Sequence, residues 1–127
     1  MKIVAMIARY LLALIFLVFG LNNFLLFMRG PMPPGVAGEF AGLLMSTHYS
    51  YVVGAIMVIS AVLFLVNRYV GLGLTLLGPV LFNILLFHIL MFPSGIGLGA
   101  FATLLWALVA WEHRVVFERL FAARLEE

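Results

Sequence analysis

Residues 78–95 read GPVLFNILLFHILMFPSG, an apolar run in which Pro79, Asn83 and His88 stand out. Together with the apolar residues before it, the run forms one long segment from about residue 69 to residue 92. About 20 apolar residues suffice for a helix to cross a lipid bilayer. The segment therefore predicts a membrane-spanning helix that carries polar groups within the membrane.

The composition of the whole chain agrees with a membrane location. Hydrophobic residues make up 66% of the 127 residues and charged residues 9%, which is too much apolar surface for a water-soluble domain to bury. Three further apolar runs cover about 3–28, 49–66 and 95–117, and none has the period-two alternation of barrel strands. We expect a single all-α domain over 1–127, an integral membrane bundle of four transmembrane helices.

The first run begins with a basic residue, as secretion signals do. It is too long for such a signal, and Asn22-Asn23-Phe24 does not resemble a cleavage site of small residues. We expect this segment to remain attached as the first span.

The connection over residues 28–50, MRGPMPPGVAGEFAGLLMSTHYS, is the most irregular part of the chain. Its prolines can extend the chain or start a helix, and the apolar residues after them recur at helical spacing. This pattern predicts a short interfacial helix in the first external loop. A glycine side of that helix is expected to press against the bundle; it consists of Gly35, Gly38 and Gly42.

Basic residues predict the orientation, because short loops rich in Lys and Arg stay in the cytoplasm. Most of them flank one side of the predicted spans, and Arg29 alone falls on the other. Both termini are therefore expected to be cytoplasmic, in the cell membrane of a bacterium or an archaeon. Anionic lipid accounts for this basic rim, so nucleic acid is not an expected partner. The tail, apolar on one side from Val115 to Leu125, is expected to continue the fourth helix along the membrane surface.

A topology experiment tests this orientation. A reporter that is active only in the cytoplasm should work when fused to the C-terminus and fail when inserted near Gly35. The reverse pattern would place the connection over residues 28–50 in the cytoplasm.

The chain contains no cysteine, which excludes disulfide relays and thiolate metal sites. The histidines follow no metal-ligand spacing, so no metal site is predicted. Any redox role then depends on a bound cofactor or a partner.

Three segments resemble the DoxX-like family of small membrane proteins in order and spacing. They are ARYLLALIFLVFGLNNFLLFM (8–28), PMPPGVAGEFAGLLMSTHY (31–49) and NRYVGLGLTLLGPVLFNILLFHILMFPSG (67–95). The resemblance implies four transmembrane helices and, for some members, association with quinone-linked or thiol-related oxidoreductases. Members often carry a glutamate in the second span, and Met57 stands at the corresponding place here. This departure weakens any mechanism that needs a carboxylate within the membrane, including proton-coupled transport.

Polar residues in the outer halves of the predicted spans define a candidate binding site. Polar groups at such depth are costly unless they are satisfied. A pocket for the head of a quinone-like molecule or a bound lipid is one reading; its residues would be Asn22, Asn23, Asn83 and His88, with Glu39 in the helix above them. Asparagines that tie the first span to the third, and a His88 that reaches the headgroups, are the structural alternatives. Asn83 and His88 lie about 140° apart around a regular helix, so only a local change at Pro79 would aim both at one ligand.

The fourth span carries a strip of small residues, which lets helices approach closely within the bundle or against another subunit. The strip consists of Gly99, Thr103, Ala107 and Ala110.

These features favour a non-catalytic role for the isolated chain. We expect an accessory or anchoring subunit of a membrane assembly, with the bilayer and other membrane subunits or further copies of the chain as partners. The alternative is a quinone-handling subunit with a pocket in the outer leaflet. A small-molecule carrier is the third alternative, and it would require an oligomer because the chain is too short to surround a pore alone.

Overall fold

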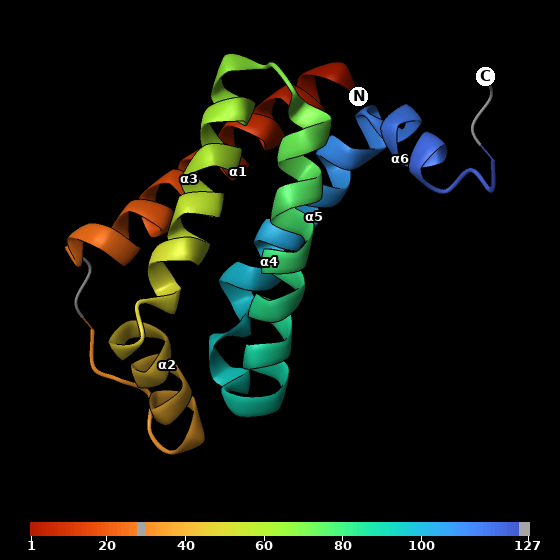
Figure 1. Cartoon of the computed structure of the whole chain (residues 1–127). Coiled ribbons are helices and arrows are strands. Elements are labelled where there is room, and N and C mark those ends of the chain that lie inside the picture. The colour runs from red at the N-terminus through yellow and green to blue at the C-terminus, as the bar shows by residue number, and fades with distance from the viewer. Residues whose placement is uncertain (28–29, 125–127) are drawn as a thin grey trace.

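Four apolar helices long enough to cross a membrane dominate the computed structural model, which describes residues 1–27 and 30–124 (Figure 1). They are α1 (Lys2–Leu25), α3 (Tyr49–Val66), α4 (Val70–Met91) and α5 (Ile96–Glu112), the last preceded directly by the 3-10 turn η1 (Pro93–Gly95). The described residues contain no strand. The predicted all-α helical bundle is confirmed.

The first three helices lie close to the segments expected for them. α3 covers the expected residues, and α4 is shorter by one residue at each end. α1 ends at Leu25 because Leu26 adopts a left-handed conformation (φ 52°), and the Leu26 amide then bonds to the carbonyl of Asn22. The expected end of the first span at Met28, its neighbour Arg29 and the tail residue Leu125 lie outside the described residues.

The expected end of the fourth span, at Phe117, is wrong. α5 ends at Glu112, the chain bends at His113 (φ −110°, ψ 27°), and a separate helix, α6 (Arg114–Leu120), follows. The bend brings apolar side chains of α6 back to the bundle, where Val116 faces Gly71 of α4 and the Phe117 ring lies 5.8 Å from that of Trp106. A straight continuation would separate these side chains from the bundle.

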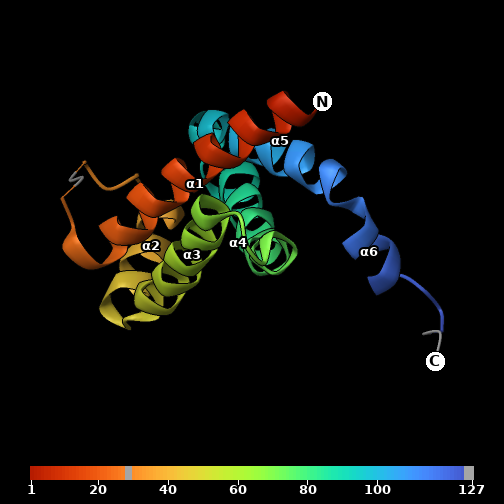
Figure 2. The same cartoon turned by 90° about the horizontal axis from the view of Figure 1, so that it is seen from above.

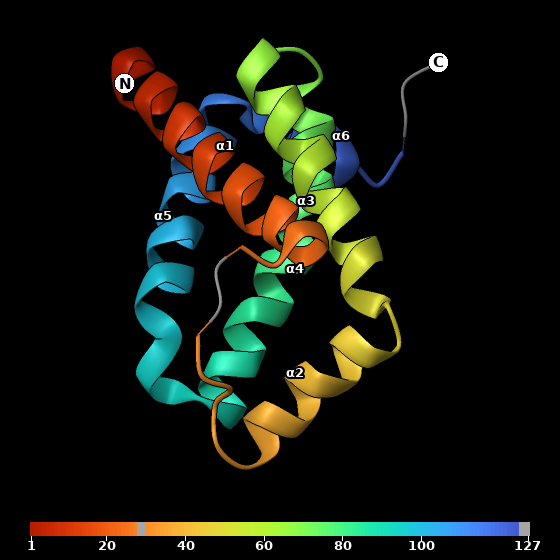
Figure 3. The same ribbon diagram turned by 90° about the vertical axis from the view of Figure 1, so that its left-hand side faces the viewer.

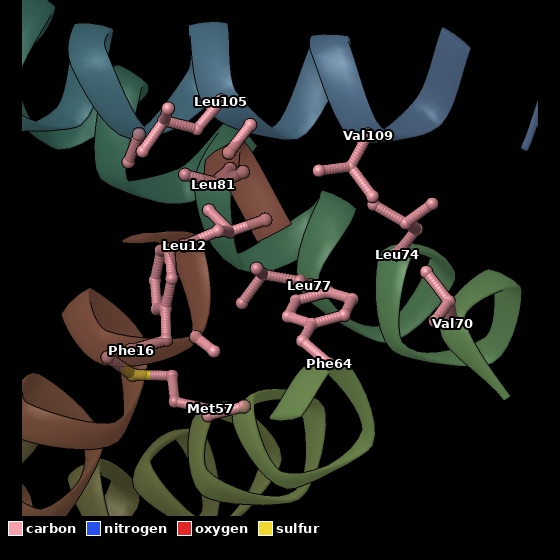
Figure 4. Close-up of a cluster of buried hydrophobic side chains, with 14 residues drawn as sticks. Leu12, Phe16, Met57, Phe64, Val70, Leu74, Leu77, Leu81, Leu105 and Val109 are labelled. Carbon is pink, nitrogen blue, oxygen red and sulfur yellow. The ribbon is translucent and has the colours of Figure 1, made fainter. Parts of the chain in front are cut away.

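The four long helices form a ring around one apolar core. α1 packs against α3 and α5, and α4 packs against the same two helices (Figure 2). Figure 4 shows large side chains from all four helices pointing into the shared interior. Those with essentially no exposed surface include Leu12, Phe64, Leu74, Leu77 and Val109.

The most extensive helix pair is α1 with α3, and glycines allow its close approach. A Cβ atom placed on Gly54 would lie 2.8 Å from the Cβ of Asn23 and 3.0 Å from the carbonyl oxygen of Gly20. One placed on Gly20 would lie 3.0 Å from the Cβ of Met57. The two backbones therefore meet at a point where neither glycine has room for a side chain.

The helix expected in the first connection is present as α2 (Val36–Ser46), which packs against α3 and α4 (Figure 3). Its contact side is not the glycine side. Ala37 is fully buried, and the Phe40 ring stacks on Phe87 at 5.6 Å. A side chain at Gly42 would meet no atom within 4 Å, and one at Gly38 would meet the Pro33 carbonyl of the preceding loop. The expected glycine contact with the bundle is therefore wrong, because larger apolar side chains make it.

The ends of the bundle differ in what they carry. The start of α1, the α3–α4 turn and α6 share one end, which we call the basic end, and α2 and η1 lie at the other (Figures 1 and 3). The basic end holds the groups that the sequence places on one side of the membrane, since Lys2, Arg68 and Arg114 all belong to it.

Candidate functional site

A cavity of about 270 Å³ opens between the four long helices and extends toward η1. Phe16 and Phe19 of α1 and Met57 of α3 form part of its wall, and Ile84 and His88 of α4 form another part. Glycine, alanine and leucine residues of α5 complete it. Among the lining residues only His88 has a polar side chain, so the cavity suits an apolar molecule that makes one polar contact.

The orientation of His88 is fixed by its own helix. The His88 Nδ1 atom lies 2.8 Å from the carbonyl oxygen of Ile84. Because a carbonyl only accepts hydrogen bonds, Nδ1 carries the hydrogen in this contact. When the ring is neutral, Nε2 is its remaining hydrogen-bond acceptor. A matching ligand would carry a hydroxyl group that donates to Nε2.

Aromatic rings hold the imidazole of His88 in place. Phe87 meets it edge-on with centroids 5.1 Å apart, and Phe92 lies 6.4 Å away. Gly95 of η1 is part of the same arrangement, because a Cβ atom there would lie 3.0 Å from Cδ2 of His88 and 2.9 Å from Cδ2 of Phe92. The tight turn between α4 and α5 therefore brings a residue without a side chain next to the imidazole.

The small-residue strip of α5 is divided between the interior and the surface. Gly99 is buried and lines the cavity, and a Cβ atom there would lie 3.2 Å from Cγ2 of Ile84. Thr103 donates its hydroxyl to the Gly99 carbonyl at 2.8 Å. Ala107 is exposed and Ala110 is half-buried. Close packing within the bundle therefore accounts for Gly99, whereas Ala107 is open to lipid or another subunit.

Asn83 and Glu39 lie outside the cavity. Asn83 is exposed, and its Nδ2 donates to the Pro79 carbonyl one turn earlier at 2.8 Å. The amide therefore needs no partner on another helix. Glu39 is exposed in the first turn of α2. Neither lines the cavity beside His88.

The two asparagines of α1 are half-buried. Asn23 contacts the second span, with its Nδ2 3.7 Å from the sulfur of Met57. The alternative of asparagines that tie the first span to the third is wrong for Asn83, because its exposed amide donates within α4. Asn23 supports the cavity indirectly through Met57, and the backbone carbonyl of Asn22 accepts the hydrogen bond that ends α1.

The sequence pattern missed the apolar wall of the cavity. Met57 stands out in the sequence only as a departure from the DoxX-like pattern, yet it is buried and forms part of the wall. Phe16 and Ala102 were indistinguishable from ordinary core residues. Helical spacing is the one signal in the sequence that points to this wall, since Ile84 and His88 lie one turn apart on the same side of α4.

Within residues 1–27 and 30–124, no three His, Cys, Asp or Glu side chains are placed to hold a metal ion. No protein family, curated protein or solved structure matches the chain.

Proposed function

We propose that this protein is a membrane subunit that binds a quinone-like hydrophobic molecule in the cavity beside His88. The observation that carries the proposal is the combination of an apolar cavity with one oriented imidazole. A quinone-type ligand matches this combination, because it has an apolar body and a head group that forms hydrogen bonds. The DoxX-like resemblance is in keeping with this ligand class.

The orientation of His88 favours the reduced form of such a ligand. A quinol carries hydroxyl groups that donate to the free Nε2 lone pair, whereas an oxidised quinone offers only acceptors. Among the residues that line the cavity, no second polar side chain is present to assist a reaction. The proposed role is therefore to hold the ligand for a partner in the membrane. An accessory or anchoring subunit without its own ligand is the competing function.

Replacing His88 by phenylalanine tests this proposal. The variant should fold and lose about tenfold in affinity for a short-chain benzoquinol, the equivalent of one hydrogen bond. Binding is measured by thermal stabilisation of the purified protein, and copurifying quinone is identified by chromatography of a lipid extract. Asn83→Leu is the matched control, because it removes an exposed polar group from the same helix and should leave binding unchanged.

Two outcomes would contradict the proposal. If neither benzoquinol nor benzoquinone stabilises the unmodified protein and its lipid extract contains no quinone, the anchoring function remains. If Asn83→Leu weakens binding as strongly as His88→Phe, the ligand occupies the outer surface of α4 and not the cavity.

A further inference from the structure

A second cavity, of about 280 Å³, lies at the basic end of the bundle. It is formed where α1 begins and where α3 and α5 end. In contrast to the cavity beside His88, five of its seven lining residues carry polar or charged side chains: Lys2, Arg9, Asn67, Glu112 and His113. The basic residues that the sequence predicts at a membrane surface therefore surround a cavity.

Arg9 is the deepest charged group of this second cavity and is only 7% exposed. Its guanidinium donates one hydrogen bond, to the Phe64 carbonyl in the last turn of α3, and lies 4.5 Å from the centre of the Tyr10 ring. A guanidinium has five N–H donors. In the described part of the chain, no carboxylate oxygen lies within 4.0 Å of it. Among the described residues, Ser60 Oγ is the only buried side-chain N or O atom without a hydrogen-bond partner, so the remaining Arg9 donors are open to the cavity, where an acceptor can reach them.

The charges around this second cavity suit an acceptor with a single negative charge. Lys2 and Arg9 contribute two positive charges and Glu112 one negative charge, which leaves one positive charge when His113 is neutral. Guanidinium groups bind phosphate oxygens well, because their planar donors match two oxygens at once. A phosphodiester carries the required single charge. Glu112 would repel a more highly charged anion.

The surroundings of the second cavity favour a lipid as the source of that phosphodiester. The first turns of α1 beside it expose large apolar side chains, with Ile3 70% and Ile7 51% exposed. An acyl chain can lie against these side chains while the headgroup enters the cavity. Free phosphate would make no use of them.

We propose that the cavity at the basic end binds the phosphodiester headgroup of an anionic phospholipid of the phosphatidylglycerol class. Arg9 and Lys2 hold the phosphate oxygens. The acyl chains run along the exposed side of α1. The site is separate from the cavity beside His88 and does not depend on the ligand proposed there.

Titration of the purified full chain in detergent tests the site. Short-chain phosphatidylglycerol should bind, as measured by native mass spectrometry and thermal stabilisation, and short-chain phosphatidylcholine and inorganic phosphate should bind far more weakly. Lys2→Gln should lower the affinity for phosphatidylglycerol about fivefold, because one positive charge near the headgroup is lost. Glu112→Gln should raise it by a similar factor. Arg68→Gln, in the exposed turn outside the cavity, should leave it unchanged.

Three results would overturn the proposal. Inorganic phosphate that binds as tightly as the lipid would indicate a free-anion site. An equal loss of affinity in Arg68→Gln and Lys2→Gln would indicate general attraction to a basic surface. Loss of stability together with weaker lipid binding in Glu112→Gln would make this carboxylate the structural counterion of Arg9.

Discussion

Replacing Gly54 by leucine is expected to abolish the folded bundle. Gly54 lies at a close approach of α1 and α3, where even a Cβ atom would be 2.8 Å from the Cβ of Asn23. Neither this atom nor the Gly20 carbonyl at 3.0 Å can move without its backbone. The two helices would have to separate, at a cost of at least about 3 kcal/mol in the free energy of unfolding. Size-exclusion chromatography and thermal unfolding followed by tryptophan fluorescence would detect the loss.

Gly97→Leu is the matched control for Gly54→Leu. Gly97 is also a helical glycine, in α5, but a side chain there would meet no atom within 4 Å. Its stability should change by about 0.5 kcal/mol or less. If Gly54→Leu were monodisperse and melted at the temperature of Gly97→Leu, the close crossing of α1 and α3 would be incorrect.

Replacing Phe64 by alanine should have the second largest effect. The Phe64 ring is fully buried between α3 and α4, where a Cβ atom on Gly73 would lie 2.8 Å from its Cε1. Removal of the ring leaves a cavity at that contact. We expect a loss of about 3 kcal/mol, the low end of the range for soluble cores, because transfer from lipid into the protein interior contributes little. Reversible unfolding in a denaturing detergent measures this loss.

The glycine opposite Phe64 provides a further test of this contact. Gly73→Leu alone should destabilise the protein by collision with the ring, whereas the double variant with Phe64→Ala should regain part of the lost stability. Leu65→Ala, at a neighbouring position that is 41% exposed, serves as the control and should have little effect. Additive losses in the double variant would mean that Phe64 and Gly73 do not pack against each other.

Apolar length alone predicts the four long helices, since a bilayer requires every backbone amide to be bonded within its own helix. The end of the fourth span is not predictable in this way. Val116 and Phe117 are apolar enough to continue a span, and only their contacts with Gly71 and Trp106 favour a bend at His113. Those contacts join residues far apart in the sequence.

The candidate site could be predicted only by depth along the helices. Asn83 and His88 do lie in the same half of α4, but they point in different directions, as their spacing of five residues requires. The sequence does not specify which direction faces the interior, because α4 is apolar all round. The packing of α3 and α5 against α4 determines it, and this places His88 in the cavity and leaves Asn83 outside.

The short connection between α3 and α4 has a consequence for the topology of the chain. Only three residues separate Val66 from Val70, and Asn67 and Tyr69 both adopt left-handed conformations that reverse the chain. Three residues reach about 10 Å, far less than the roughly 30 Å of a bilayer core. The end of α3 and the start of α4 must therefore lie on the same side of any membrane that the two helices cross. Arg68, in the middle of the turn, then stays on that side whichever way the bundle is oriented.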